Sequence, residues 1–567
     1  MTDLRPPSAE STDREEPKRW SRRIDPIVFG VTGAAAIGFV VWGLVSTANL
    51  SSAASDARSW VITNTGWMFV LSASFFVLFV LWLAASKYGR VPLGRDDETP
   101  EFKTVSWIAM MFSAGMGIGL MFWGVAEPLS HYAAPPPGTD EAQSEAALQT
   151  AMATTMFHWA LHPWAIYAVV GIAIAYGTFR KGRKQLISSA FRPLFGRRTE
   201  GKAGKIIDIL AIFATLFGSA ASLGLGALQI GAGLQYNDWV NDPGKIVFVV
   251  IIVTLTILFI LSAVSGIERG IQWLSNTNMV LALTLAVFVF VAGPTLFILN
   301  LLPTALGDYL DQMTEMASRT AASGDAQMEA WLSGWTIFYW AWWVSWTPFV
   351  GMFIARISRG RTIREFVTGV LLVPSLVSLV WFAVFGGAGI FEQRESGNMI
   401  TDGVVDSNAA LFDLLDAYPI ASVTTILVMI LVGIFFVSGA DAASIVMGTL
   451  SEKGSTEPSK PSVIFWGALT GAVAAIMLWI GDKAASESDP NPALTGLQNI
   501  TIVAAVPFVI VMVLLAVSLY KDLQSDPVVV RQRLGQEVVE DAVVVGVEEH
   551  DGDFALVVEP AEPSDDD

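Results

Sequence analysis

"SAGMGIGLMFWG", residues 113–124, places four glycines inside an otherwise apolar stretch. Each glycine costs an α-helix about 1 kcal/mol relative to alanine. Irregular backbone at membrane depth is tolerated only where it contacts protein or lines a cavity. Two explanations follow for the glycines. Either the helix unwinds here and exposes its backbone, or Gly115 and Gly119 form the small-residue pattern that lets membrane helices pack closely.

The composition of the whole chain is that of a membrane protein. Of 567 residues, 53% are hydrophobic and 15% charged, and the mean hydropathy is +0.54, whereas soluble domains average about 25% charged residues. The absence of cysteine excludes disulfides and thiolate metal sites. The four histidines show no spacing typical of a metal site. No set of nucleophile and base indicates an enzyme, and we expect neither a cofactor nor a nucleic-acid partner.

Twelve apolar stretches are each long enough to cross a bilayer as a helix, at about 20 residues per crossing. They lie at 25–48, 60–86, 104–126, 149–178, 206–235, 245–266, 276–302, 333–355, 366–390, 420–448, 462–481 and 497–520. The sequence therefore predicts an all-α integral membrane protein with 12 transmembrane helices surrounded by lipid. We expect a disordered N-terminal tail at 1–24, one membrane domain at 25–520, and an acidic tail at 521–567 with a short hairpin over 541–560.

The basic residues indicate how the chain is oriented. If the N-terminus is cytoplasmic, the outer loops hold five of the 34 lysines and arginines, and the other 29 lie inside. Cytoplasmic loops of membrane proteins carry the excess of positive charge. We therefore expect both termini to be cytoplasmic, in a multi-pass protein of the cell (inner) membrane.

"FHWALHPWAIY", residues 157–167, is a second interrupted stretch. Pro163 removes a backbone donor in the middle of a predicted span, which distorts a helix. Trp159, Trp164 and Tyr167 surround the proline, and they lie within the span rather than at its ends, where interfacial aromatic residues gather. We expect the three rings to face one cavity.

"FYWAWWVSW", residues 338–346, holds four tryptophans and one tyrosine. On one helix, a stripe of aromatic side chains falls within about 80° of arc: Trp331, Trp335, Phe338, Trp342, Trp346, Phe349 and Phe353. Such a stripe is more often core packing than a binding site. However, indole faces offer a negative quadrupole to a cation that donates no hydrogen bonds, which describes a quaternary ammonium.

Three motifs together resemble the betaine/choline/carnitine transporter family, and most closely its sodium-coupled glycine betaine symporters: "AGMGIGLMFWGVAEPL" (114–129), "FHWALHPWAIY" (157–167) and "GWTIFYWAWWVSWTPFVG" (334–351). The resemblance covers about residues 25–520. It implies a LeuT-like fold of two inverted five-helix repeats, at about 104–302 and 333–520, preceded by two extra helices. It also implies a secondary transporter of a small compatible solute, sodium as the coupling ion, and a homotrimer.

The resemblance further implies the residues of the substrate site. An aromatic box matches Trp159, Trp164, Tyr167 and Trp343. Trp342 and Trp346 match residues that guide the substrate, Phe338 matches a gate, and Met116, Gly117 and Gly119 match exposed backbone beside the box. An acidic residue at the position of Gly119 would favour choline. The glycine here and the lack of any other acid at the site therefore favour a zwitterion, with glycine betaine preferred over carnitine, ectoine or choline.

Two sodium sites are implied in the same way. The first falls on Thr215, Ser219 and Phe349, and the second on Ser113, Met116, Phe435 and Ser438. The family pattern has two consecutive hydroxyls at the second site, whereas Ser438 is followed by Gly439, so we expect Ser438 to be the most sensitive ligand. Two alternatives stay open. The hydroxyls bond to carbonyls of their own helices, or protons replace sodium at Glu127 and Asp441, because acids inside membranes are usually functional.

Overall fold

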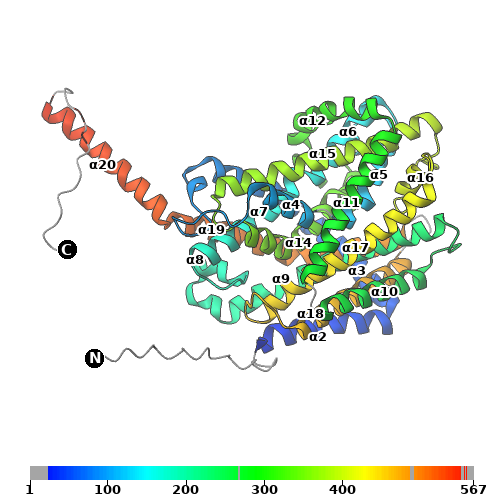
Figure 1. Ribbon diagram of the computed structural model, residues 1–567, viewed down its shortest axis with the longest axis horizontal. Coiled ribbons are helices and arrows are strands. Elements are labelled where there is room, and N and C mark those ends of the chain that lie inside the picture. The colour runs from blue at the N-terminus through cyan, green and yellow to red at the C-terminus, as the bar shows by residue number, and fades with distance from the viewer. Residues whose placement is uncertain are drawn as a thin grey trace, which may run out of the picture.

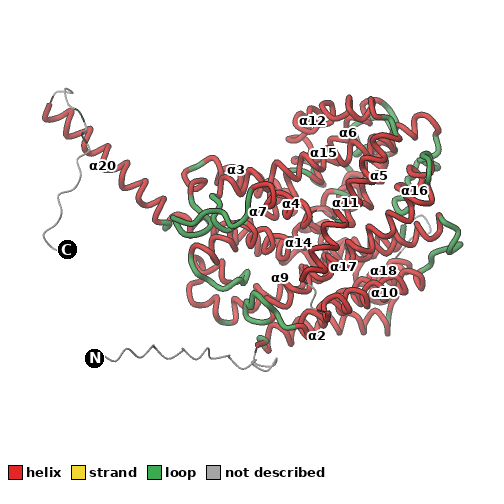
Figure 2. The backbone as a smooth tube through the Cα atoms, in the orientation of Figure 1, coloured by secondary structure: helices red, strands yellow, loops and turns green. Residues whose placement is uncertain are grey.

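The structure is a computed structural model that describes residues 23–115, 117–265, 268–484, 491–550, 555 and 557. Within these ranges the chain is helical and contains no strand, apart from two isolated bridges that pair residues 92 with 362 and 401 with 404. The helices form one bundle, from which the C-terminal helix α20 (Pro527–His550) projects (Figure 1). Most loops lie at the two ends of the bundle (Figure 2). The predicted all-α membrane fold is confirmed.

Nine spans among the described residues are long and apolar enough to cross a membrane. They are formed by α2 (Pro26–Val45), α3 (Thr47–Ala85), α6 (Glu145–Trp159) with α7 (Leu161–Ala175), α9 (Lys202–Tyr236), α10 (Lys245–Ser265), α15 (Ile363–Ser396), α17 (Ala421–Ser451), α18 (Lys460–Ala484) and α19 (Pro492–Gln524). A tenth candidate is α11 (Glu268–Ala292) with α12 (Thr295–Ser318). The two remaining predicted stretches carry the glycine and tryptophan motifs. They form α4 (Thr104–Gly115) with α5 (Ile118–Ala133), and α14 (Thr336–Ile357).

Three local predictions are wrong. The stretch 276–302 is not one helix, because α11 ends before Gly293–Pro294 and α12 leaves at an angle of 110°. The aromatic stripe is not on one helix either, because α13 (Ala326–Gly334) and α14 are separated at Trp335. The hairpin over 541–560 is replaced by α20 as far as His550. The remaining tail and residues 1–22 lie largely outside the described residues.

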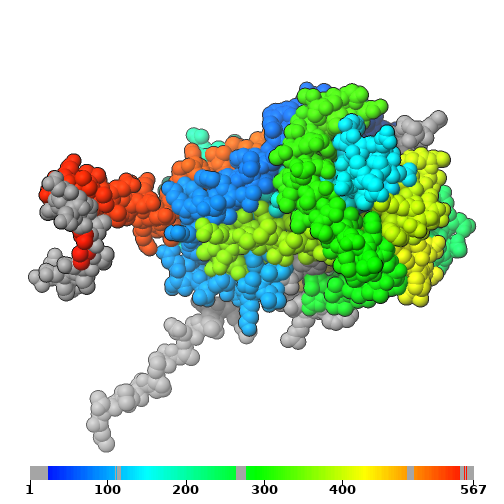
Figure 3. Space-filling model, turned by 90° about the horizontal axis from the view of Figure 1, so that it is seen from above, coloured from blue at the N-terminus to red at the C-terminus, as the bar shows by residue number. Residues whose placement is uncertain are grey.

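The centre of the bundle is formed by α5, α6, α7, α9, α14 and α17. The span of α6 and α7 is 94% buried over its most apolar window, whereas that of α10 is only 17% buried. Helix α14 packs on α7, α9 and α19, and α17 packs on α9 and α18. The segment of α11 and α12 lies on the outside (green in Figure 3). The span interrupted between α6 and α7 is therefore interior, whereas the bent pair of α11 and α12 and the apolar helix α10 lie at the outside of the bundle.

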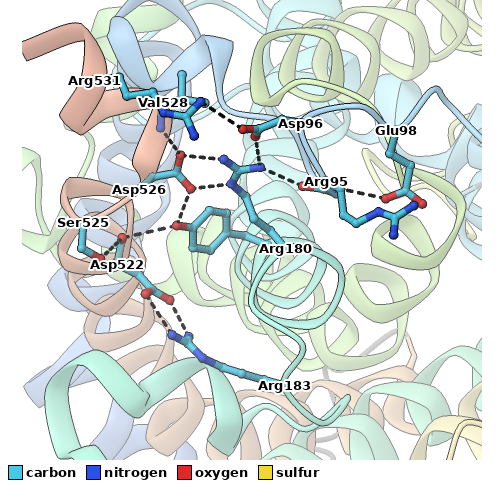
Figure 4. A network of polar contacts seen from close by, with 12 residues as sticks. Arg95, Asp96, Glu98, Arg180, Arg183, Asp522, Ser525, Asp526, Val528 and Arg531 are labelled. Carbon is cyan, nitrogen blue, oxygen red and sulfur yellow. Dashed lines mark hydrogen bonds and ion pairs between the residues drawn. The ribbon is translucent and has the colours of Figure 1, made fainter. Parts of the chain in front are cut away.

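Charged side chains hold the junction of α19 and α20 against the end of the α7 span (Figure 4). Arg180 binds both carboxylate oxygens of Asp526, at 2.5 and 2.9 Å, and Arg183 binds Asp522 in the same two-pronged way. The Tyr176 hydroxyl also donates to Asp526 at 2.9 Å. Planar guanidinium–carboxylate pairs of this kind are strong and directional. The start of α20 is therefore fixed, although the rest of that helix projects from the bundle.

We expect Asp526→Asn to loosen this junction by up to about 3 kcal/mol, because Arg180 would keep a buried charge with only part of its pairing. Burial alone raises the pKa of Asp526, but hydrogen bonds from Arg180, the Val528 backbone and Tyr176 more than offset it, so the pKa lies below its ordinary value. The contribution is therefore complete above about pH 3.9 and is lost only as the pH falls through the lower folded pKa.

Hydrogen–deuterium exchange over residues 520–535 checks both statements. Exchange should be faster in Asp526→Asn and equally slow in the wild type at pH 8 and pH 5, after correction for intrinsic rates. Asp96→Asn is the control, because the Asp96 side chain is 47% exposed and shares Arg180. An equal effect of both substitutions would contradict the assignment.

Candidate functional site

The glycine motif interrupts a helix at the level of the central cavity. Helix α4 ends at Gly115, and Gly117 is extended (φ −148°, ψ −155°) before α5 begins at Ile118. Side chains of other helices bond to carbonyls just beyond the break: Trp381 Nε1 donates to Leu120 at 3.0 Å, and Gln229 Nε2 donates to Met121 at 2.9 Å. Of the two explanations left open for the glycines, the structure supports the interrupted helix. Met116 lies outside the described residues, as does the side chain of Ser113.

A second interruption separates α6 from α7 at Ala160. Pro163 has no N–H to give to the Trp159 carbonyl, four residues earlier. The Ser378 hydroxyl of α15 donates to that carbonyl instead, at 3.1 Å, and Trp343 Nε1 of α14 donates to the His158 carbonyl at 3.0 Å. The carbonyls freed at the break therefore bind α6 to α15 and to α14 through these two hydrogen bonds.

The predicted box residues form one buried aromatic cluster. Trp343 is central: its ring centroid lies 4.7 Å from Trp342, in a stacked pair, 4.9 Å from Trp159, and 6.3 Å from Tyr167. Tyr167 in turn lies 5.6 Å from Trp164. The stack continues along α14, because Phe338 lies over Trp342 at 5.7 Å and Trp346 meets it edge-on.

The indole N–H groups in this cluster are occupied at their edges. Those of Trp342 and Trp346 donate to the Ser222 hydroxyl (3.0 Å) and the Gly218 carbonyl (3.1 Å) of α9. Those of Trp159 and Trp343 donate to Glu127 (2.6 Å) and to the His158 carbonyl. Buried indoles need such partners, and with their edges fixed they offer only their faces to a ligand.

A cavity of about 380 Å³ lies beside this cluster. Six of the predicted site residues line it: Gly117, Ser219, Trp346, Phe349, Phe435 and Ser438. The cavity walls do not include the box residues Trp159, Trp164, Tyr167 and Trp343, nor Trp342 and Phe338. The cavity reaches Gln185, Arg356 and Thr456, at the end of the bundle where the basic loops lie. In this conformation the box rings contact one another, and Trp346 joins the box to the open cavity.

Gly119 faces the box. A Cβ atom at this position would lie 2.7 Å from Cη2 of Trp342 and 2.8 Å from Cη2 of Trp159. Those distances are far inside van der Waals contact, so only glycine lets both rings rest against the backbone here. The alternative explanation of the motif, close helix packing, therefore contributes as well, with the rings as the packed neighbours.

The predicted ion-binding hydroxyls differ in their hydrogen bonds. Thr215 Oγ1 donates to the Ala211 carbonyl of its own helix at 2.8 Å. This hydrogen bond is the one expected if the hydroxyl does not bind an ion. Ser438 Oγ donates to the Phe435 carbonyl at 3.3 Å. Among the described residues, Ser219 Oγ has no hydrogen-bond partner although Ser219 is only 5% exposed, and Ser219 lines the cavity with Phe349. Ser219, rather than Ser438, is the hydroxyl that the structure leaves free for a ligand.

Sequence analysis missed a buried polar cluster behind the box. Glu127 accepts hydrogen bonds from Trp159 and the Tyr339 hydroxyl, shares a hydrogen bond of 2.7 Å with His158 Nδ1, and lies 3.5 Å from His131. The expectation that no acid lies near the site is therefore wrong: Glu127 bonds to a box residue, and Asp441 lines the cavity. The separation of Glu127 and His131 by four residues was the signal available, since it places both on one helix face.

The same cluster corrects the statement about histidine spacing. Glu127, His131 and His158 bring ligand atoms within 4.8 Å of one another, near enough to hold a metal ion. His158 lies 27 residues beyond His131, so only the tertiary structure reveals the set. The Glu127 oxygens and the His158 nitrogens form hydrogen bonds within the protein, whereas both ring nitrogens of buried His131 have no hydrogen-bond partner among the described residues.

Helices interrupted around a central cavity, inside a shell of apolar helices, form the scaffold of a multi-pass membrane transporter. Residues 27–528 match the family model described as BCCT, the betaine/carnitine/choline family of transporters. The chain belongs to this family. It is therefore a transporter rather than an enzyme.

Curated relatives agree over nearly the whole chain. It is 46% identical over 539 residues to the betaine/ectoine transporter LcoP of Corynebacterium glutamicum, covering 95% of this chain and 84% of that protein. It is 44% identical to the glycine betaine transporter OpuD of Bacillus subtilis, covering 88% and 94%. It is 39% identical to glycine betaine transporter 1 of Vibrio parahaemolyticus, covering 92% and 98%.

Proposed function

We propose that this protein imports glycine betaine, or a closely related compatible solute, by sodium symport and alternating access. The observation that carries the proposal is the buried cluster of Trp159, Tyr167, Trp342 and Trp343, in which the rings contact one another and the three indole N–H groups are held by hydrogen bonds. Each ring contributes about 0.5–2 kcal/mol to a desolvated quaternary ammonium. The relatives named for betaine transport support the choice of substrate.

The arrangement of the cavity supports a transport cycle. The open cavity ends at Trp346 and reaches the basic loops, while the box is closed on itself. Since basic loops face the cytoplasm in membrane proteins, we assign this conformation to the inward-facing half of the cycle, with both termini cytoplasmic. In the outward-facing half, Phe338 and Trp342 would separate to admit the substrate, which is the gating role that the resemblance implies. Assembly as a homotrimer stays a prediction.

Uptake of radiolabelled betaine into proteoliposomes tests this proposal. We expect uptake with an inward sodium gradient and none without it, with competition by unlabelled betaine. Ectoine and carnitine, tested as competitors at equal concentration, define the substrate range. Failure of the wild-type protein to accumulate any of these solutes would reject the proposed function.

Proton coupling is the second candidate, and one observation favours it. Asp441 lines the cavity and is only 4% exposed, a position from which a carboxylate can exchange protons with the substrate pathway. Uptake that persists without sodium and follows a pH gradient would establish this alternative.

Substitution of Gly119 should change substrate choice. Gly119→Ala displaces the rings of Trp159 and Trp342 and should lower betaine affinity by about tenfold, since about 1–2 kcal/mol of packing strain opposes the closed box. Gly119→Asp adds a carboxylate at the same point, so choline, which lacks one of its own, should begin to compete. The measurement is inhibition of betaine binding by choline in both variants. Equal choline inhibition in the alanine and aspartate variants would show that charge at this position plays no part.

A further inference from the structure

Glu127 in α5 is a fully buried acid that the proposed transport cycle does not use. Three donors from two other helices point at its carboxylate. Trp159 Nε1 lies 2.6 Å from Oε2, the Tyr339 hydroxyl binds the same oxygen, and His158 Nδ1 lies 2.7 Å from Oε1. A buried carboxylate leaves water at a high cost, which only several hydrogen bonds can offset.

The surroundings of Glu127 suit an ionised carboxylate when Thr336 donates to His158. An indole N–H can only donate. The Thr336 hydroxyl lies 3.0 Å from His158 Nε2, and when it donates to that nitrogen, the proton of a neutral His158 lies on Nδ1 and points at Glu127. With the Tyr339 hydroxyl, three donors then surround the Glu127 carboxylate, which only accepts hydrogen bonds when it is ionised.

The anion lies one side chain away from the box. Glu127 holds the edge of Trp159, and the same ring lies 4.9 Å from Trp343 and 6.1 Å from Trp342. In a buried region of low dielectric, a unit charge acts over such a distance with little screening. A strong hydrogen bond to the indole N–H also adds electron density to the ring, which strengthens its attraction for a cation.

We propose that Glu127 is the fixed counter-charge of the aromatic box: it orients Trp159 and supplies negative charge, through the indole, to a quaternary ammonium that cannot donate a hydrogen bond. This role rests on the proposed function. It makes Glu127 a positioning residue that never contacts the substrate. It also explains why a box for a permanent cation is built against a buried acid, although the carboxylate of a zwitterionic substrate would be repelled by direct contact.

A metal ion in the same cluster is the competing interpretation. Glu127, His131 and His158 form a ligand set that suits zinc. The His131 ring nitrogens have no hydrogen-bond partner among the described residues, which leaves them available to a metal. One observation weighs against a metal: buried Arg319 lies beside the cluster, 5.9 Å from the ring of Trp331 that packs on His131. A nearby positive charge repels a second cation.

Glu127→Gln removes the charge and keeps the shape. The glutamine oxygen can accept from Trp159 and Tyr339. Its amide can donate to His158 Nδ1, provided that the histidine moves its proton to Nε2 and donates to Thr336. Every hydrogen bond of the cluster then survives, so the variant should fold. Tyr339→Phe is the matched control, because it removes one hydrogen bond from Glu127 and leaves the charge in place.

The experiment measures the preference for a positive charge. Binding of glycine betaine and of 3,3-dimethylbutanoate, in which a tert-butyl group replaces trimethylammonium, is measured on the purified full-length protein by competition against radiolabelled betaine, or directly by calorimetry. In Glu127→Gln, we expect betaine affinity to fall by on the order of tenfold, and affinity for the uncharged-headgroup analogue to change by less than about twofold. Tyr339→Phe should keep the wild-type ratio of the two affinities.

The outcomes separate the possible failures. A wild-type protein that binds no betaine rejects the proposed function before any variant is compared. If the wild type binds betaine but Glu127→Gln weakens both ligands equally, or neither, the counter-charge role is overturned and the function stands. Loss of betaine preference on treatment of the wild type with a chelator, restored by zinc, would overturn it in favour of the metal. If Glu127→Gln cannot be recovered as a folded protein, Glu127→Asp replaces it, because the shorter side chain moves the charge away from Trp159. We then expect a smaller fall in the ratio of betaine affinity to analogue affinity, and an unchanged ratio overturns the proposal.

Discussion

Trp343→Leu should abolish betaine uptake while leaving a folded protein. Trp343 is the ring that contacts most of the box, with Trp342, Trp159 and Tyr167 all within 6.3 Å of its centroid. Leucine retains much of the apolar volume but has no quadrupole, so about 0.5–2 kcal/mol of cation attraction is lost directly. The His158 carbonyl also loses the hydrogen bond from Trp343, at a cost in stability of about 1–3 kcal/mol.

The lost cation attraction corresponds to a fall in affinity of about 2- to 30-fold, whereas the lost hydrogen bond lowers the stability of the free and the bound protein alike. Titration of the purified variant with labelled betaine measures the affinity. Trp340→Leu is the matched control: the same substitution on the same helix, at a side chain only 1% exposed that packs on Phe157 and His162 away from the box. Both variants should lose thermal stability, but only Trp343→Leu should lose affinity. Equal loss in both would show that the tryptophans act as general core packing.

The helix breaks could be predicted from the sequence because they have local causes. Glycines at 115 and 117 and the proline at 163 act on their own backbone, so the breaks beside Gly117 and at Ala160 follow from residue type and position. The bend between α11 and α12 had the same kind of signal in the dipeptide Gly293–Pro294. The break was missed because apolar residues flank it on both sides, and hydropathy measures how apolar a stretch is but not whether the chain bends within it.

The polar support of the box could not be predicted, because its members are joined only by tertiary packing. Glu127 and Tyr339 are 212 residues apart, and nothing in the order of either segment indicates that α5 and α14 place them together. The aromatic stripe failed for a related reason. A periodicity of 100° per residue assumes one continuous helix, whereas the chain changes direction at Trp335, so Trp331 contacts His131 instead of extending the stack along α14.

The residues predicted to bind sodium show how side-chain hydrogen bonds alter a prediction made from residue type. Sequence comparison within the resemblance favoured Ser438 as the most sensitive sodium ligand, because Gly439 removes a neighbouring hydroxyl. The structure favours Ser219. A hydroxyl that already bonds to its own helix must give up that bond to bind an ion. The buried Ser219 oxygen, by contrast, has no hydrogen-bond partner in the described part of the chain, and Ser219 lines the cavity.

Ser219→Ala should therefore raise the sodium concentration for half-maximal betaine uptake by about tenfold, since a ligand oxygen is worth about 1–2 kcal/mol when its loss is not replaced. Thr215→Ala should raise it by less than about twofold, because its hydroxyl is satisfied by Ala211, and Ser438→Ala should fall between the two. Ser345→Ala is the control: its hydroxyl is buried, bonds to its own helix at 2.8 Å, and lies where α14 meets α9.

The nature of the coupling ion is decided by current. At fixed pH, betaine is added to an outer solution that contains sodium, and an inward current should follow. Each sodium ion that enters with a zwitterion carries one charge, and the membrane potential drives that charge with about 2.3 kcal/mol per 100 mV. Replacement of sodium by potassium should remove the current in the wild type, and Ser219→Ala should shift its sodium dependence without changing its dependence on betaine at saturating sodium. A current that survives the replacement and follows pH would instead assign coupling to Asp441, the acid that faces the cavity.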